Sequence, residues 1–185
     1  GFQCGRLQYL RELTQNAIEG IQEKGGKGEI FWTFDREILK KTTVHKLQII
    51  DTGIGMDGEE IRRLMNGMYS SGKTQDMRAN YGIGAKVAGL SRSPEGMTYR
   101  CFKDGRGHLA ELCKRPADGK YGLRQLEEED GSVSPYLEIG LEHRPKQIED
   151  SGTAVTLLGQ SENEDTFTSP PEGEYGTNWL IRYLN

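Results

Sequence analysis

Residues 47–56, LQIIDTGIGM, combine a strand-like apolar run with a carboxylate and two glycines. Three of the first four residues are apolar and two of them are β-branched, which favours a strand that ends at Asp51. An ionised carboxylate only accepts hydrogen bonds and is costly to bury unless a donor reaches it. Gly53 and Gly55 lack a Cβ, so a flat ligand can approach their backbone closely. An amino group such as the exocyclic amine of adenine would suit this acceptor; a strand followed by an Asp-Gly turn is the alternative.

Residues 7–21 have apolar side chains at helical spacing, which predicts an amphipathic helix. At about 100° per residue, Glu12, Asn16 and Glu19 fall on a face roughly opposite the apolar stripe. Glu12 and Asn16, one turn apart, could place a general base and a metal-ligating oxygen at the same site. Because Mg²⁺ retains several waters and substrate phosphates, one Asn carbonyl can be sufficient protein ligation. The alternative is an ordinary amphipathic helix with a solvated polar face.

Residues 67–74, GMYSSGKT, match the phosphate-loop pattern GxxxxGK[ST] letter for letter. A phosphate loop follows a buried strand and opens a helix whose first N–H groups hold the phosphates. Here the preceding residues 59–66, EEIRRLMN, have helical spacing, and the following residues 75–82, QDMRANYG, have no apolar helical face. We therefore favour a glycine- and serine-bearing loop that carries one lysine, Lys73.

A second glycine-rich stretch, residues 81–91 (YGIGAKVAGLS), leads into an apolar helical run. Gly82 and Gly84 would leave free backbone N–H groups at the start of this helix, and Lys86 adds a positive charge. These groups together predict a site for an anion such as phosphate. The dinucleotide pattern GxGxxG is not met, because position 87 is Val, and a glycine-rich turn before a core helix is the alternative.

The rest of the chain reads as short strands separated by turns. Residues 29–34 and 44–51 are predicted strands with a loop or short helix between them, and residues 57–66 are a predicted short helix. The second half predicts an antiparallel meander of short strands at residues 96–103, 107–114, 121–126 and 134–141, followed by one more strand at residues 152–159. The three histidines have no nucleophile or metal-ligand spacing around them and are assigned no role.

Composition limits the kind of protein. The 185 residues fit one domain, residues 1–185, and begin and end within helical patterns, as a domain cut from a longer protein would. Charged residues make up 28% and the net charge is −4, which provides no general attraction to nucleic acid or to membranes. No apolar stretch approaches the roughly 18 residues of a membrane span. Three cysteines without CxxC spacing indicate reduced thiols in a cytoplasmic protein.

Four motifs, in this order, resemble the GHKL ATP-binding superfamily of DNA gyrase B subunits, ninety-kilodalton heat-shock chaperones, histidine kinases and MutL. ELTQNAIEG, residues 12–20, resembles the first box, ExxxNxxD, and DTGIGM, residues 51–56, resembles the second, DxGxG. YGIGAKVAG, residues 81–89, resembles the glycine box that ends the ATP lid, and SGTAVTL, residues 151–157, the last box. Residues 51–74 also resemble the MORC ATPases, in which a short lid precedes a similar glycine box. The resemblance therefore assigns GMYSSGKT to the lid.

The resemblance implies an α+β protein with a Bergerat fold, an α/β sandwich in which helices cover one face of a mixed, mostly antiparallel sheet. ATP would lie between helices and sheet, with Mg²⁺ as a cofactor. Glu12 would be the catalytic base that activates water, and Asn16 would contact the nucleotide and ligate the metal. The other implied nucleotide contacts are Asp51 on the adenine amine, Gly53, Gly55 and Met56 beside it, Asn66 before the lid, Gly82, Ile83, Gly84, Ala85 and Lys86 on the phosphates, and Thr153 near the adenine.

Two positions depart from the first box. Glu19 stands where Asp is usual, and Gly20 stands where Ala is usual. Glu19 retains the negative charge on a longer side chain, which changes the arrangement of water expected around the adenine.

The resemblance implies a magnesium-dependent ATPase module whose lid closes over ATP and whose hydrolysis drives dimerisation of a larger protein. Glu12 argues against a histidine kinase, because kinases of this superfamily usually carry Asn or His at that place. An ATP-sensing module without significant hydrolysis, a phosphotransfer domain and a plain interaction domain stay as alternatives. The expected partners are ATP and ADP, a second copy joined through regions outside residues 1–185, and nucleic acid for the full-length protein; no membrane partner is expected.

Overall fold

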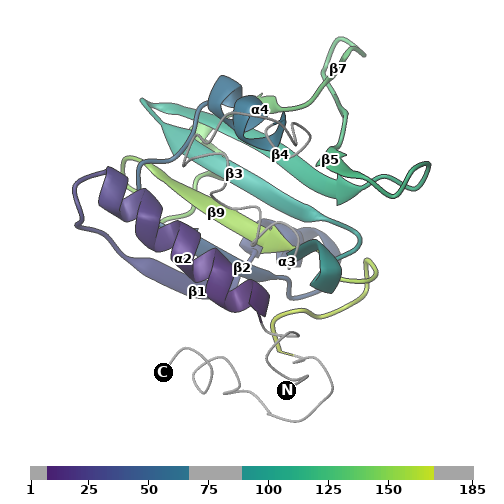
Figure 1. Cartoon of the computed structure of the whole chain (residues 1–185), viewed down its shortest axis with the longest axis horizontal. Coiled ribbons are helices and arrows are strands. Elements are labelled where there is room, and N and C mark those ends of the chain that lie inside the picture. Colours follow the sequence, from purple (N-terminus) through teal and green to yellow (C-terminus); the bar gives the residue numbers. More distant parts are fainter. Residues whose placement is uncertain (1–7, 67–88, 169–185) are drawn as a thin grey trace, which may run out of the picture.

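The computed structural model describes residues 8–66 and 89–168, without the side chains of residues 65 and 66. Its main element is a seven-stranded sheet in the order β1-β2-β9-β3-β4-β5, in which β8 also pairs with β4 (Figure 1). All pairings among the described strands are antiparallel. A separate two-stranded sheet joins β6 and β7. The strands are β1 Ile30–Phe34, β2 Leu47–Asp51, β3 Met97–Lys103, β4 Arg106–Lys114, β5 Tyr121–Leu123, β6 Leu126–Glu127, β7 Val133–Ser134, β8 Leu137–Ile139 and β9 Gly152–Leu157.

The two longer helices lie on one face of the sheet and leave its middle strands between them. Helix α2 (Gln8–Glu23) contacts β1 and β2, and helix α4 (Gly58–Asn66) contacts β4 and β5. Strands β9 and β3 run between these helices (Figure 1). The other described helical elements are the short helix α3 (Arg36–Thr42), the 3-10 turn η1 (Leu141–His143) and residues 89–92.

Helix α2 buries the apolar stripe that its sequence predicts. The buried side chains of Tyr9, Leu10, Leu13 and Ala17 belong to one core cluster with Leu47 and Ile49 of β2 and Val155 of β9. The helix ends just before Gly25 and Gly26, whose φ angles of 121° and 82° favour glycine. The N–H of Gly26 returns to the carbonyl of Ile21 at 2.9 Å, which closes the last turn.

The opposite face of the sheet holds a buried polar network around Asp35, the N-cap of α3. Asp35 Oδ1 accepts the N–H of Ile38 at 3.0 Å and starts the helix. Its Oδ2 accepts from Gln48 Nε2 at 3.2 Å, Thr156 Oγ1 at 2.8 Å and Arg100 Nη1 at 2.9 Å. This carboxylate is fully buried and fully satisfied, and it holds α3 against β2, β9 and β3.

The predicted fold class is confirmed, and the predicted meander is correct for β3, β4 and β5, which follow one another in the sheet. The predicted strand at residues 134–141 is wrong in extent. It is divided between the last residue of β7 and the short β8, because Pro135 has no N–H to donate to a strand partner. The last strand, β9, inserts between β2 and β3, so it becomes central.

Lys46, 3% exposed, fixes the loop that follows β9. Its ammonium group donates to the carbonyl oxygens of Leu158 at 2.6 Å, Ser161 at 2.9 Å and Glu164 at 2.6 Å. An ammonium group has three N–H donors, and all three are used here. The buried charge therefore joins residues 158–164 to the start of β2.

Replacing Lys46 by methionine should destabilise the protein by about 2–4 kcal/mol, because three inward-facing carbonyl groups would lose their donor. Urea unfolding measures this change in the free energy of unfolding. Lys41→Met, at an exposed position on α3, is the matched control and should stay within about 0.5 kcal/mol of the wild type. A Lys46 variant as stable as the control would contradict the anchoring role.

Candidate functional site

Asp51, at the end of β2, is a carboxylate with few partners on the face that α2 covers. It lies two residues beyond Ile49 of the core, and so on the same side of the strand. Its Oδ1 accepts the N–H of Gly53 at 2.9 Å, and the described part of the chain brings no side-chain donor to it. Burial raises the pKa of Asp51 from 3.8 to about 7, against smaller lowering effects of the Gly53 and Thr153 backbone and of the Lys24 charge. A ligand that donates a hydrogen bond to this carboxylate would therefore offset the cost of its burial.

The loop after Asp51 packs directly on the last turn of α2. The N–H of Ile54 donates to the carbonyl of Gly20 at 3.0 Å. A Cβ at position 53 would lie 2.5 Å from the carbonyl carbon of Gly20, so only glycine allows this approach. Gly55 has a φ of 68°, and a Cβ there would collide with the carbonyl oxygen of Phe102 on β3. The two glycines therefore let the loop pass between α2 and β3.

Strand pairing aligns three small polar side chains on the helix-covered face. Asp51 on β2 lies opposite Thr153 on β9, and Thr153 lies opposite Cys101 on β3. Burial raises the pKa of the Cys101 thiol to about 12, although a hydrogen bond with the side chain of Thr153 lowers it slightly. The thiol is therefore neutral at physiological pH.

Asp51, Thr153 and Cys101 form a row of paired residues across the sheet. The row continues to His108 on β4, which lies opposite Cys101 and is 3% exposed. Burial lowers the pKa of this imidazole, and the charge of Arg106 adds to the effect. The ring of Tyr136 meets it edge-on, with the centroids 5.7 Å apart. Asp51 is thus followed along the row by side chains that carry no charge at neutral pH.

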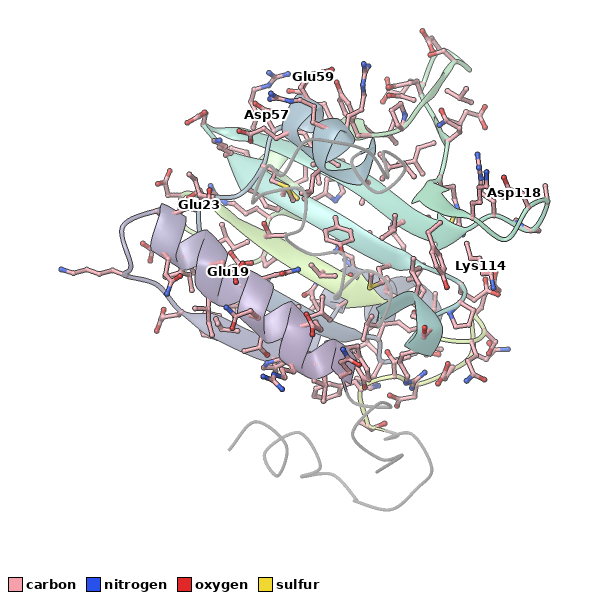
Figure 2. All side chains as sticks on the ribbon, in the orientation of Figure 1. Glu19, Glu23, Asp57, Glu59, Lys114 and Asp118 are labelled. Atoms are coloured by element: carbon pink, nitrogen blue, oxygen red, sulfur yellow. The ribbon has the colours of Figure 1, made fainter. Side chains whose placement is uncertain are left out.

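Glu12 and Asn16 lie one turn apart on α2, and both are half-buried. Gln8 Nε2 donates to Glu12 Oε1 at 3.5 Å. Glu19 accepts from Gln15 Nε2 at 2.7 Å, on the exposed side of the helix. Figure 2 shows Glu19 on α2 and Asp57 at the start of α4, on the two sides of β9 and β3.

A capping box starts α4 immediately after Met56, which packs on the core. The N–H of Glu60 donates to Asp57 Oδ1 at 2.8 Å, and the N–H of Asp57 donates to Glu60 Oε2 at 2.9 Å. Lys103 of β3 also binds Glu60 Oε1 at 2.8 Å. This network fixes the direction in which the chain leaves the DTGIGM motif.

Several predicted residues lie outside the described part of the chain. Asn66 ends α4, but its side chain is not among those described. The predicted lid, residues 67–74, and the predicted phosphate contacts also lie outside it. These contacts are Gly82, Ile83, Gly84, Ala85 and Lys86. Of the predicted site residues that are described, the structure brings Asp51, Gly53, Gly55 and Thr153 together where β2 ends and β9 begins. It places Glu12 and Asn16 on α2, the helix that this loop contacts.

Two supporting residues were not recognised from the sequence, although they stand directly before Thr153 in the SGTAVTL motif. Ser151 Oγ donates to the carbonyl of Gly53 at 2.7 Å. A Cβ at Gly152 would collide with the carbonyl oxygen of Asp51. Both residues hold the loop after β2 in place, and their position in the motif was the available signal.

Comparison with known proteins gives the family. A family model for the histidine kinase-, DNA gyrase B- and HSP90-like ATPases matches residues 6–157. Among solved structures, the fold is similar to the 43K ATPase domain of Thermus thermophilus gyrase B in complex with an aminocoumarin. The two are 18% identical with a TM-score of 0.49, over 96% of this chain and 38% of that chain. A search of curated proteins found no match.

The family match covers most of the chain, and the chain therefore belongs to the histidine kinase-, DNA gyrase B- and HSP90-like ATPase family. Domains of this family bind ATP, so the site at the end of β2 belongs to a nucleotide-binding domain. The resemblance to the GHKL superfamily is thereby confirmed. Within residues 8–66 and 89–168, no helix has the length and apolar character needed to cross a membrane.

Asp51→Asn should raise the melting temperature more at pH 8 than at pH 5. The pKa of Asp51 is raised in the folded state from 3.8 to about 7, so the stability linked to its protonation is lost between these two pKa values and is only partly lost at pH 5. Because Asp51 is not sealed from solvent, we expect a gain of about 1–3 kcal/mol at pH 8, which is several degrees. Thermal unfolding at both pH values measures it, with Asp104→Asn at an exposed turn as the control. Equal effects of Asp51→Asn at both pH values would contradict the raised pKa.

Proposed function

We propose that this chain binds ATP with Mg²⁺ and hydrolyses it. The observation that carries the proposal is the carboxylate of Asp51, half-buried at the end of β2, to which the described residues bring backbone donors but no side-chain donor. The exocyclic amine of adenine would supply the missing donor. A charge-assisted hydrogen bond to this group is stronger than a neutral one, and binding would offset the cost of burying the carboxylate.

The residues around Asp51 are suited to a flat base. Thr153 is half-buried beside it and has a hydroxyl group that can donate and accept. Gly55 follows in the same loop and has no side chain, and Met56 after it has a polarizable apolar side chain. We propose that these residues hold the adenine while Asp51 selects its amine.

The chemistry of Asn16 and Glu12 fits Mg²⁺ and the hydrolytic step. The amide oxygen of Asn16 is a hard ligand of the kind that Mg²⁺ takes alongside phosphate oxygens and water. Bound Mg²⁺ would neutralise charge on the phosphates. One turn earlier on the same helix, Glu12 would accept a proton from the water that attacks the terminal phosphorus, as the bond to the ADP oxygen breaks.

The remaining functional assignments rest on the sequence. They are phosphate binding by residues 82–86, the contact of Asn66, closure of a lid, and dimerisation of a larger protein with nucleic acid as a partner. The chain spans 38% of the length of the gyrase B chain, so what ATP would drive in the whole protein is likewise a proposal.

Inosine triphosphate tests the role of Asp51, because its base carries a carbonyl where adenine has an amine. The wild-type protein should bind ATP at least about 100-fold more tightly than inosine triphosphate, since the carbonyl would face an acceptor. Asp51→Asn should weaken ATP binding and narrow or reverse this preference, because the asparagine amide can donate to the carbonyl. Titration calorimetry of both nucleotides against both proteins measures the ratio. An unchanged ratio in the variant would show that Asp51 does not contact the base.

Glu12→Gln should slow ATP hydrolysis by about 10²- to 10⁴-fold while ATP still binds, because glutamine cannot accept the proton. Single-turnover measurements separate the chemical step from binding. Asn16→Ala should instead weaken binding of Mg²⁺ and ATP together. Glu23→Gln, at an exposed carboxylate on the last turn of α2, is the control and should hydrolyse ATP like the wild type. Hydrolysis by Glu12→Gln at the wild-type rate would remove Glu12 as the base, and binding without any turnover in the wild type would leave an ATP-sensing module.

A further inference from the structure

Gly20 is a glycine that the described residues do not require. It lies within α2, three residues before the helix ends at Glu23, where alanine would stabilise the helix more than glycine does. Its backbone is helical and is not among the residues with positive φ. No turn or cap therefore explains its presence.

Packing within the described residues does not explain Gly20 either. A Cβ at this position would have one neighbour within 4 Å among them, Asp51 Oδ1 at 3.8 Å, which is an ordinary van der Waals distance. The glycines of the neighbouring loop differ, because a Cβ at Gly53 would lie 2.5 Å from backbone and one at Gly55 would collide with the carbonyl oxygen of Phe102. Gly20 thus leaves a space of about one methyl group beside the carboxylate of Asp51.

This space is adjacent to the group that would receive the adenine amine. The next positions across the sheet, Thr153 and Cys101, also have small side chains, so β9 and β3 place no bulky residue next to Asp51 in this row. An amine with one alkyl substituent keeps one N–H and can still donate to Asp51. Room for the substituent then decides whether such a base binds.

We propose that Gly20 is a specificity-determining residue that lets the site accept adenine nucleotides with an alkyl group on the exocyclic amine, in addition to ATP. The inference rests on the proposed function, because it requires the amine to bind at Asp51. A side chain at position 20 would occupy the space that the alkyl group needs.

Binding of ATP, N6-methyl-ATP and N6,N6-dimethyl-ATP to the wild type and to Gly20→Ala tests the inference by titration calorimetry. The wild type should bind ATP and N6-methyl-ATP with affinities of the same order. It should reject the dimethyl compound, which has no N–H left to donate. Gly20→Ala should lower the affinity for N6-methyl-ATP relative to ATP by about 10- to 200-fold, the usual effect of one misfitting methyl group.

Gln22→Ala, at an exposed position on the same turn of α2, is the matched control for a change in helix stability. It should keep the wild-type ratio of the affinities for ATP and N6-methyl-ATP, and neither variant should melt below the wild type. The inference is overturned if Gly20→Ala keeps that ratio, or if the wild type binds ATP but rejects N6-methyl-ATP as strongly as the dimethyl compound. Failure of the folded wild type to bind any of the three would overturn the proposed function as well.

Discussion

The contact between the last turn of α2 and the loop after β2 determines the geometry of the whole site. The loop can approach because position 53 has no side chain, and the N–H of Ile54 then reaches the carbonyl of Gly20 at 3.0 Å. Ser151 adds a hydrogen bond from the other side of the loop. Asp51 belongs to the sheet and Glu12 and Asn16 belong to the helix, so this contact sets the position of the carboxylate relative to the helix residues. It would thereby set the distance between the residues that bind the base of a nucleotide and those that bind its phosphates and metal.

Two aspartates on opposite faces of the sheet, the buried Asp35 and the half-buried Asp51, show how the structure separates stability from binding. Asp35 receives hydrogen bonds from a backbone N–H and from three side chains, and it needs nothing further. Within the described residues Asp51 is bound only by backbone groups, those of Gly53 and Thr153, and its raised pKa reflects the unfavourable burial of its charge. A carboxylate that lowers the stability of the protein and faces a space is typical of a binding site. A carboxylate whose hydrogen bonds are all made within the protein instead stabilises the fold. The face that carries Asp51 is also the face that α2 and α4 frame.

Much of this arrangement follows from local sequence. The apolar spacing of residues 7–21 predicts α2 and its buried side, and the run that ends at Asp51 predicts β2, because both signals arise from neighbouring residues. The length of the strands in the second half was less predictable. Pro135 interrupts a predicted strand, and β5 and β8 are short because they pair only with parts of β4. The histidines carried no recognisable spacing, yet strand pairing places His108 in the row that begins at Asp51.

By itself the sequence determined the types of the groups and the elements that carry them: an acid at a strand end, an acid and an amide one helical turn apart, and glycines after the strand. These properties depend on residues close together in the chain, where periodicity and turn chemistry act directly. Only the tertiary structure decided that β9 lies between β2 and β3, so that Thr153 and Cys101 stand beside Asp51. It alone also showed that Gly53 is required by the backbone of α2, whereas Gly20 faces a space. Strand order and close approaches are set by packing between residues about 30 to 100 positions apart, and no local pattern specifies them.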